Sequence, residues 1–174
     1  EMGDSSLAAG LDPLLAGRHI EVDDGFVVEL GEANRNLEKS FEIPVVAGFG
    51  HHEVCEDWHR RSDLVCLPLA RSFGYAGEGT VPPLPLAMSS EQSFGEMGGM
   101  RAAVGFDHEN DIPGPLIMAV LSPGDEGAGG PLLVIGDSNF ATNEHIDREG
   151  NANFALDAVA WLIRDGRRVA PTLR

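Results

Sequence analysis

Cysteine is scarce in this chain, since Cys55 and Cys66 are the only two among 174 residues. Two cysteines are too few for a disulfide scaffold or a zinc ribbon, so we expect free thiols, although a single bridge between them stays open. Long apolar runs are also missing, because none approaches the roughly 20 residues of a membrane-spanning helix. These absences exclude a disulfide-rich fold and a membrane span within the sequence.

Basic residues are few as well. Twelve lysines and arginines stand against 28 acidic residues, which leaves a formal net charge of −16. Such a surface repels phosphate backbones and anionic lipid headgroups, so we expect no nucleic-acid partner. The length and the 43% hydrophobic content suit one α/β domain over residues 1–174. The opening letters EMGDSSLAAGLDPLLAG already follow a helical pattern, and we expect a fragment of a longer protein.

Hydrophobic periodicity divides the chain into short elements. The spacing predicts helices over 7–16 and 151–165, and strands over 27–30, 43–49, 64–72, 114–122 and 130–138. The runs at 43–49 and 64–72 are apolar throughout, as in strands buried on both faces. The Gly-rich turn between the last two strands is short enough for a hairpin, although its length does not fix the pairing. For the last helix we expect Asn151 or Asn153 as N-cap and Gly166 as its end.

The letters VIGDSNFATN at 134–143 raise the possibility of a serine nucleophile at Ser138. They resemble the opening block of the GDSL/SGNH hydrolases, which also use a late Asp-x-x-His. That late motif is absent here, and His145 is the only histidine after Ser138. The structural alternative is a tight strand-end turn, in which Asp137 and Ser138 bind the loop backbone and Asn143 takes a left-handed conformation. We expect Ser138 not to be a nucleophile, and loop 136–145 to be the first place to look for a ligand.

The letters HHEVCEDWH suggest a metal site through His51, Cys55 and His59, which would share one face of a helix. The span from the first to the last ligand is about 12 Å along a helix axis, too far for one ion, so we expect a solvated connector and no metal. A further polar loop, SSEQSFGEMGG at 89–99, contains Ser93 and Glu96. This mixture is found in sugar and peptide sites and also in ordinary loops, so both interpretations stay open.

Five blocks occur in an order that resembles a known family. They are DDGFVVEL, HHEVCEDWHRRSDLVCLPLARS, SSEQSFGE, FDHENDIPGPLIMAV and LLVIGDSNFATNEHIDREGNANFALDAVAWL. The blocks are similar to the extracytoplasmic domain of gliding-motility-type ABC transporter auxiliary proteins, from about Leu7 to Leu162. The most specific block is the last, with its Gly-Asp-Ser-x-Phe strand end and a helix that finishes in Trp-Leu. Where the family has His-Pro followed by Ile-Thr or Val-Thr, this chain has HHEVCED, and His52 is the matching histidine.

The resemblance implies a Rossmann-like sheet flanked by helices, related to the class I glutamine amidotransferase fold and incomplete in this chain. It also implies a periplasmic location, with anchoring to the inner membrane by helices outside this chain and with membrane components of an ABC transporter as partners. We expect a non-enzymatic auxiliary domain that binds a partner protein or a small ligand such as a carbohydrate, without a cofactor. The alternatives are a serine hydrolase and a metal-binding module. An unpaired sheet edge favours homo-oligomers. The candidate ligand-binding residues are Asp137, Ser138, Asn143, Ser93, Glu96 and His52.

Overall fold

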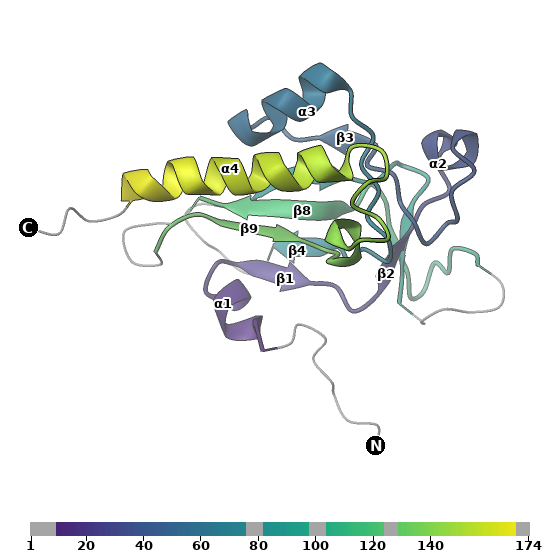
Figure 1. Cartoon of the computed structure of the whole chain (residues 1–174). Helices are drawn as coiled ribbons and strands as arrows, with labels where there is room; N and C mark the ends of the chain where they lie inside the picture. The colour runs from purple at the N-terminus through teal and green to yellow at the C-terminus, as the bar shows by residue number, and fades with distance from the viewer. Residues whose placement is uncertain (1–9, 76–81, 98–103, 124–128, 170–174) are drawn as a thin grey trace, which may run out of the picture.

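The computed structural model describes residues 10–75, 82–97, 104–123 and 129–169 (Figure 1). Its helices are α1 (Asp12–Ala16), α2 (Glu32–Asn36), α3 (Glu56–Arg61) and α4 (Asn151–Val169), with 3-10 turns η1 (Glu53–Cys55) and η2 (Asn139–Ala141). Its strands are β1 (Ile20–Val22), β2 (Phe26–Val28), β3 (Gly48–Phe49), β4 (Phe73–Tyr75), β5 (Leu84–Met88), β6 (Phe94–Glu96), β7 (Ile112–Pro113), β8 (Ile117–Ser122) and β9 (Leu132–Ile135).

The described strands form three sheets, with the orders β3-β5-β8-β9, β2-β6-β7 and β1-β4. Every pairing between them is antiparallel. The mixed α/β content agrees with the sequence prediction, but these pairings do not fit a Rossmann-like sheet, and a relation to the amidotransferase fold is not confirmed. The reason is connectivity: parallel neighbours need a long crossover, whereas only residues 123–131 separate β8 from β9 in the sequence.

The predicted strands have different outcomes. Segments 114–122 and 130–138 contain β8 and β9, which pair as a hairpin with Val120 opposite Val134. The prediction for 27–30 overlaps β2. Segments 43–49 and 64–72 were predicted as buried strands, and this is wrong for most of their length. Only Gly48–Phe49 forms a strand there, and one isolated bridge joins Val45 to Cys66.

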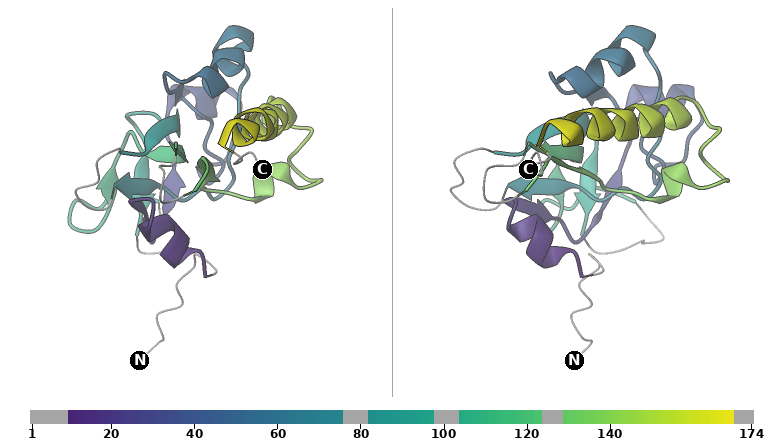
Figure 2. Two further views of the ribbon diagram at one scale, coloured as in Figure 1. Left: turned by 90° about the vertical axis from the view of Figure 1, so that its left-hand side faces the viewer. Right: turned by 60° about the vertical axis from the view of Figure 1, so that its left-hand side comes forward.

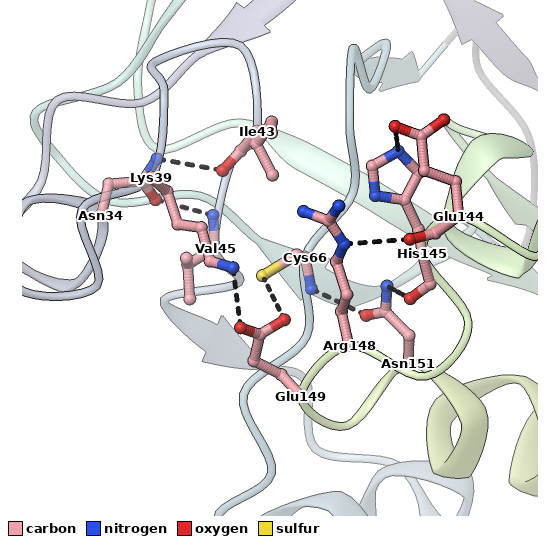
Figure 3. Close-up of polar contacts among 10 residues, drawn as sticks. All are labelled: Asn34, Lys39, Ile43, Val45, Cys66, Glu144, His145, Arg148, Glu149 and Asn151. Atoms are coloured by element: carbon pink, nitrogen blue, oxygen red, sulfur yellow. Dashed lines mark hydrogen bonds and ion pairs between the residues drawn. The ribbon is translucent and has the colours of Figure 1, made fainter.

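Two fully buried asparagines explain why these segments are irregular (Figure 3). The Asn34 side chain accepts a hydrogen bond from Val45 N at 2.8 Å and donates one to Ile43 O at 3.0 Å. The Asn151 side chain accepts from Cys66 N at 2.9 Å and donates to His145 O at 3.0 Å. Backbone groups that bind side-chain amides do not enter a strand ladder, so apolar sequence alone does not make these segments strands.

The main core lies between the four-stranded sheet and α4, which runs along β8 and β9 (Figure 1). Its centre is aromatic: the Trp58 and Phe154 rings lie 4.5 Å apart between centroids, and Phe49 lies beside both. A second, smaller cluster contains Leu15, Ile20, Phe73 and Val120. The two clusters enclose β8, whose residues after Ile117 are all buried.

Helix α4 confirms the predicted C-terminal helix but not its ends. The side chain of Asn151 binds other segments, Asn153 donates to Asp63 Oδ2, and the helix passes Gly166 to end at Val169. Of the predicted first helix, only Asp12–Ala16 is helical, and residues 7–9 lie outside the described part. In the described ranges, no helix combines the length and the apolarity needed to cross a bilayer.

Candidate functional site

The loop after β9 is held in shape by Asp137. Its carboxylate accepts hydrogen bonds from Asn139 N at 2.7 Å and from Phe140 N at 2.8 Å, which starts the turn η2. Burial raises the pKa of this carboxyl above its ordinary value, and the two backbone N–H groups and His145 counteract that rise in part. Asp137 therefore has the structural role that the tight-turn alternative predicts. The other parts of that prediction are wrong, because Asn143 does not have a positive φ and the Ser138 side chain does not cap η2.

An open hollow of about 630 Å³ lies against this loop. Three segments that are distant in sequence line it: 42–43 before the irregular strand region, the turn at 68–69, and 139–145 after β9. The lining residues are Glu42, Ile43, Pro68, Leu69, Asn139, Thr142, Asn143, Glu144 and His145. Loop 136–145, where we expected a ligand, thus forms one wall of this pocket, which we call the loop pocket.

Polar side chains of the loop pocket are available for a ligand. The amides of Asn139 and Asn143 and the carboxylate of Glu42 have no hydrogen-bond partner among the residues that the structure describes. No lysine or arginine lines the pocket, whereas Ile43, Pro68 and Leu69 give it an apolar part. This lining favours a neutral or cationic molecule with hydroxyl groups over an anion.

Leu69 stands out in the pocket wall because its φ is +57°. A bulky residue rarely takes this left-handed conformation, which costs free energy. A hydrogen bond from Leu69 N to Glu42 O, at 2.7 Å, joins the two segments here, and the Leu69 residue remains 39% exposed. A strained, exposed leucine beside unpaired amides is typical of a binding surface and not of a packed core.

Ser138 precedes η2 and is exposed. Its hydroxyl has no hydrogen bond to a histidine or to any other side chain in the described residues. His145 is nearly buried, and its Nε2 lies 3.9 Å from Glu144 Oε1. The contact between nucleophile and base that serine catalysis needs is therefore not formed between these two residues.

The other candidate loop uses its polar atoms internally. Ser93 is buried, and its hydroxyl lies 2.6 Å from Ser89 Oγ and donates to Ser90 O at 2.7 Å. Glu96 is also buried, on β6. Neither residue lines the loop pocket, so the structure separates them from Asn143. Residues 98–99 of this predicted loop lie outside the described residues.

Glu29 organises this second loop and was not singled out in the sequence. Its buried carboxylate accepts hydrogen bonds from Gly31 N at 2.6 Å, from Ser90 N at 2.8 Å and from Ser90 Oγ at 2.6 Å. A glutamate after a β-branched strand is normally a surface residue, so no sequence signal marks it. We call Glu29 with Ser89, Ser90 and Ser93 the buried serine network.

The histidine-rich segment is partly helical, with η1 followed by α3, so His51, Cys55 and His59 do not share the face of one helix. Cys55 points into the core, where Sγ lies 3.7 Å from Leu86 O and burial raises the thiol pKa to about 12. The rings of His51 and His59 do stack, at 6.3 Å between centroids. Over the described ranges, no group of three or more His, Cys, Asp or Glu residues is arranged to hold a metal ion.

His52 has two contacts that fix its position. Its Nδ1 accepts from Val54 N at 3.3 Å at the start of η1, and its ring meets Trp161 edge to face at 5.1 Å. Trp161 Nε1 in turn donates to Glu53 at 2.7 Å, a bond that lowers the pKa of Glu53. His52 therefore joins η1 to α4 and does not line the loop pocket.

Cys66 lies beside an ion pair (Figure 3). Lys39 Nζ is 2.7 Å from Glu149 Oε1, and the thiol of Cys66 lies 3.6 Å from Glu149 Oε2. Burial, and secondarily the negative charge of Glu149, raise the thiol pKa to about 11, which opposes thiolate formation. Cys55 and Cys66 are both free, so the bridge that the sequence left open is not formed. Cys66 lies in a run expected to be buried, whereas the burial of Cys55 does not fit the solvated connector expected for its segment.

Part of the loop pocket could not be found from sequence. Glu42, Ile43, Pro68 and Leu69 lie in segments predicted as strands or their flanks. Backbone hydrogen bonds between distant segments, such as those from Leu69 N to Glu42 O and from Arg71 N to Gly136 O, bring them to the loop. No family model, curated protein or solved structure matches this chain.

Proposed function

We propose that this chain is a non-enzymatic binding domain that holds a small, uncharged polar ligand, such as a carbohydrate, in the loop pocket. The observation that carries the proposal concerns the polar side chains that line the pocket. The amides of Asn139 and Asn143 and the carboxylate of Glu42 have no hydrogen-bond partner within the described residues. Amides and carboxylates are the groups that bind sugar hydroxyls, and the exposed amides of Asn139 and Asn143 are accessible to such a ligand.

The charge of the pocket supports the same ligand class. Glu42 and Glu144 contribute the formal charges of the lining, and the whole chain has a net charge of −16. This negative charge repels phosphate or sulfate groups, and no lysine or arginine lines the pocket to bind them. A neutral oligosaccharide is not repelled by this charge. In addition, Ile43 and Leu69 can pack against the apolar face of a sugar ring.

The proposed setting of this domain is an ABC-type transport system outside the cytoplasmic membrane. The support is the ordered set of sequence blocks shared with gliding-motility-type auxiliary proteins, and not the Rossmann-like sheet, which the antiparallel pairings do not fit. In this setting the domain delivers its ligand, or a partner protein, to the membrane components of a transporter. Co-purification of those components with the full-length protein from native membranes tests this part independently.

The ligand site is tested by titrating the ¹⁵N-labelled chain with cellobiose, chitobiose and maltose, and with glucose 6-phosphate as the anionic comparison. We expect saturable shifts in the amide signals of residues 139–145 and 42–43 with a neutral disaccharide, and none with the phosphate. Asn143→Ala should weaken binding at least about tenfold, the effect of losing one or two hydrogen bonds to a ligand. Gln92→Ala is the matched control, because this exposed amide lines a different hollow.

Two results would contradict the proposal. One is the absence of shifts with all three disaccharides, and the other is equal loss of binding in Asn143→Ala and Gln92→Ala. Turnover of 4-nitrophenyl acetate that disappears in Ser138→Ala would instead support the serine hydrolase.

A further inference from the structure

Strand β9 forms an open edge of the four-stranded sheet. It pairs with β8 on one side only, with Leu133 opposite Leu121 and Ile135 opposite Ala119. The hydrogen bond from Gly136 N to Met118 O, at 2.9 Å, shows which alternate residues along this strand bond to β8. Because alternate residues of an antiparallel strand bond to the same neighbour, Leu133 and Ile135 direct their N–H and C=O groups away from β8.

These four backbone groups have no hydrogen-bond partner among the described residues. The strand also lacks the features that usually protect an edge, since Leu132–Ile135 contains no charge, no proline and no bulge. The opposite edge differs, because β3 has only two residues. One edge of this sheet is therefore protected and the other is available for pairing.

Helix α4 presents an apolar stripe near the same edge. Leu156, Val159 and Ile163 are 68%, 55% and 55% exposed, at the i, i+3, i+7 spacing of one helix face. The face that packs into the core holds Phe154, Ala158 and Trp161 instead.

The stripe turns away from α3. Asp157 of α4 forms an ion pair with Arg61 of α3, and Val159 projects about 200° around the helix from Asp157. In the left view of Figure 2, α4 is seen end-on beside β9, with α3 above it and no strand beyond the β9 edge. The apolar stripe and the open edge thus lie on one side of the molecule.

We propose that this side binds a second copy of the chain, with β9 pairing antiparallel to β9 of the other copy about a two-fold axis at Val134. This register places Leu133 of one copy opposite Ile135 of the other, so all the outward N–H and C=O groups of both strands are bonded. An axis at Leu133 would place Ile135 opposite Pro131, which has no N–H to donate. The edge is therefore complementary to itself in one register.

The two-fold axis also brings the helices together. Rotation about an axis perpendicular to the sheet keeps both α4 helices on the same face, where the stripes of Leu156, Val159 and Ile163 approach each other. Burial of these side chains adds the apolar area that four hydrogen bonds alone do not provide. Since each copy has a net charge of −16, salt should strengthen the dimer by screening the repulsion between copies.

Sedimentation velocity over a range of protein concentrations, at low and at about 0.5 M sodium chloride, measures this association. We expect a monomer–dimer equilibrium that shifts to dimer with salt. Val159→Lys and Ile135→Pro should each raise the dissociation constant at least about tenfold. The proline removes an outward N–H and no bond to β8, while Leu30→Lys, at an exposed leucine outside β9 and α4, is the control.

Val134→Cys tests the register of the two strands even if the Ile135→Pro variant does not fold. Residues directly opposite in a non-hydrogen-bonded pair have Cα atoms about 4.5 Å apart, which permits a disulfide. Oxidation should give a covalent dimer from Val134→Cys and none from Val22→Cys. A monomer at all concentrations and salts, or a dimer that Val159→Lys and Ile135→Pro leave unchanged, would overturn the proposal. Neither result depends on disaccharide binding, so this test is separate from that of the loop pocket.

Discussion

Two polar loops of this chain, 89–96 and 137–145, differ in where their side chains find partners. In the first, the buried serine network satisfies its own atoms: Glu29 accepts three hydrogen bonds, and Ser93 bonds to Ser89 and Ser90. In the second, Asp137 shapes the loop, but the amides of Asn139 and Asn143 have no partner among the described residues. Similar composition therefore serves stability in one loop and leaves binding groups open in the other.

The physical reason for the difference is burial. A polar group removed from water must be hydrogen-bonded inside the protein, so each atom of the buried serine network has a partner. An exposed amide keeps its hydrogen bonds with water and can exchange them for those of a ligand at little cost. Substitutions in the two loops should accordingly affect different quantities, namely the free energy of unfolding in the first and ligand affinity in the second.

The largest loss of stability is expected from Glu29→Ala. This change leaves three donors, Gly31 N, Ser90 N and Ser90 Oγ, without their acceptor, at a cost of about 3 kcal/mol in the free energy of unfolding. Urea unfolding followed by circular dichroism measures it. Glu91→Ala, at an exposed glutamate of the same loop, should change stability by less than about 0.5 kcal/mol. Equal losses in the two variants would contradict the role of the network.

A smaller loss is expected from Ser93→Ala. The variant removes the hydroxyl that bonds to Ser89 Oγ and Ser90 O, and about 1 to 2 kcal/mol of stability should be lost. Affinity for a disaccharide should not change, because Ser93 does not line the loop pocket. Ser138→Ala is the comparison in the exposed loop and should leave stability within about 0.5 kcal/mol. If Ser93→Ala abolished binding in a folded protein, the division between the two loops would be wrong.

The smallest of these effects concerns Asp137. Asp137→Ala should cost about 1 kcal/mol, because the N–H groups of Asn139 and Phe140 lose their acceptor but can reach water. The same urea measurement gives this value. A loss as large as that of Glu29→Ala would show that the exposed loop is as tightly integrated as the buried one.

The pH dependence of this site has a defined sign. Burial raises the pKa of Asp137 in the folded chain, so the folded state holds this proton more strongly than the unfolded state does. Stability contributed by this group is therefore present at low pH and falls as the pH rises from the ordinary carboxyl pKa to the raised one. Compared with Asp137→Asn, the natural chain should lose stability over that window in unfolding titrations. A relative gain would contradict the raised pKa.

Several features of the site were predictable and others were not. The loop after β9 was expected as the ligand-binding region, because Gly-Asp-Ser after an apolar strand is a local signal. Ser93 and Glu96 were placed with the same candidates because their sequence looks like a polar loop, and the structure puts both in buried positions. Glu42 and Leu69 gave no signal, since their position in the pocket depends on backbone hydrogen bonds between segments that are distant in sequence.

Local patterns in the sequence were enough for the segments that form β8 and β9 and for the long C-terminal helix. These follow from residue spacing, which acts over a few positions of the chain. Long-range packing instead set the antiparallel sheet order, the irregular course of the segments that Asn34 and Asn151 bind, and the loop pocket. Whether a polar atom is buried with a partner or open to a ligand depends on segments that meet only in the folded chain.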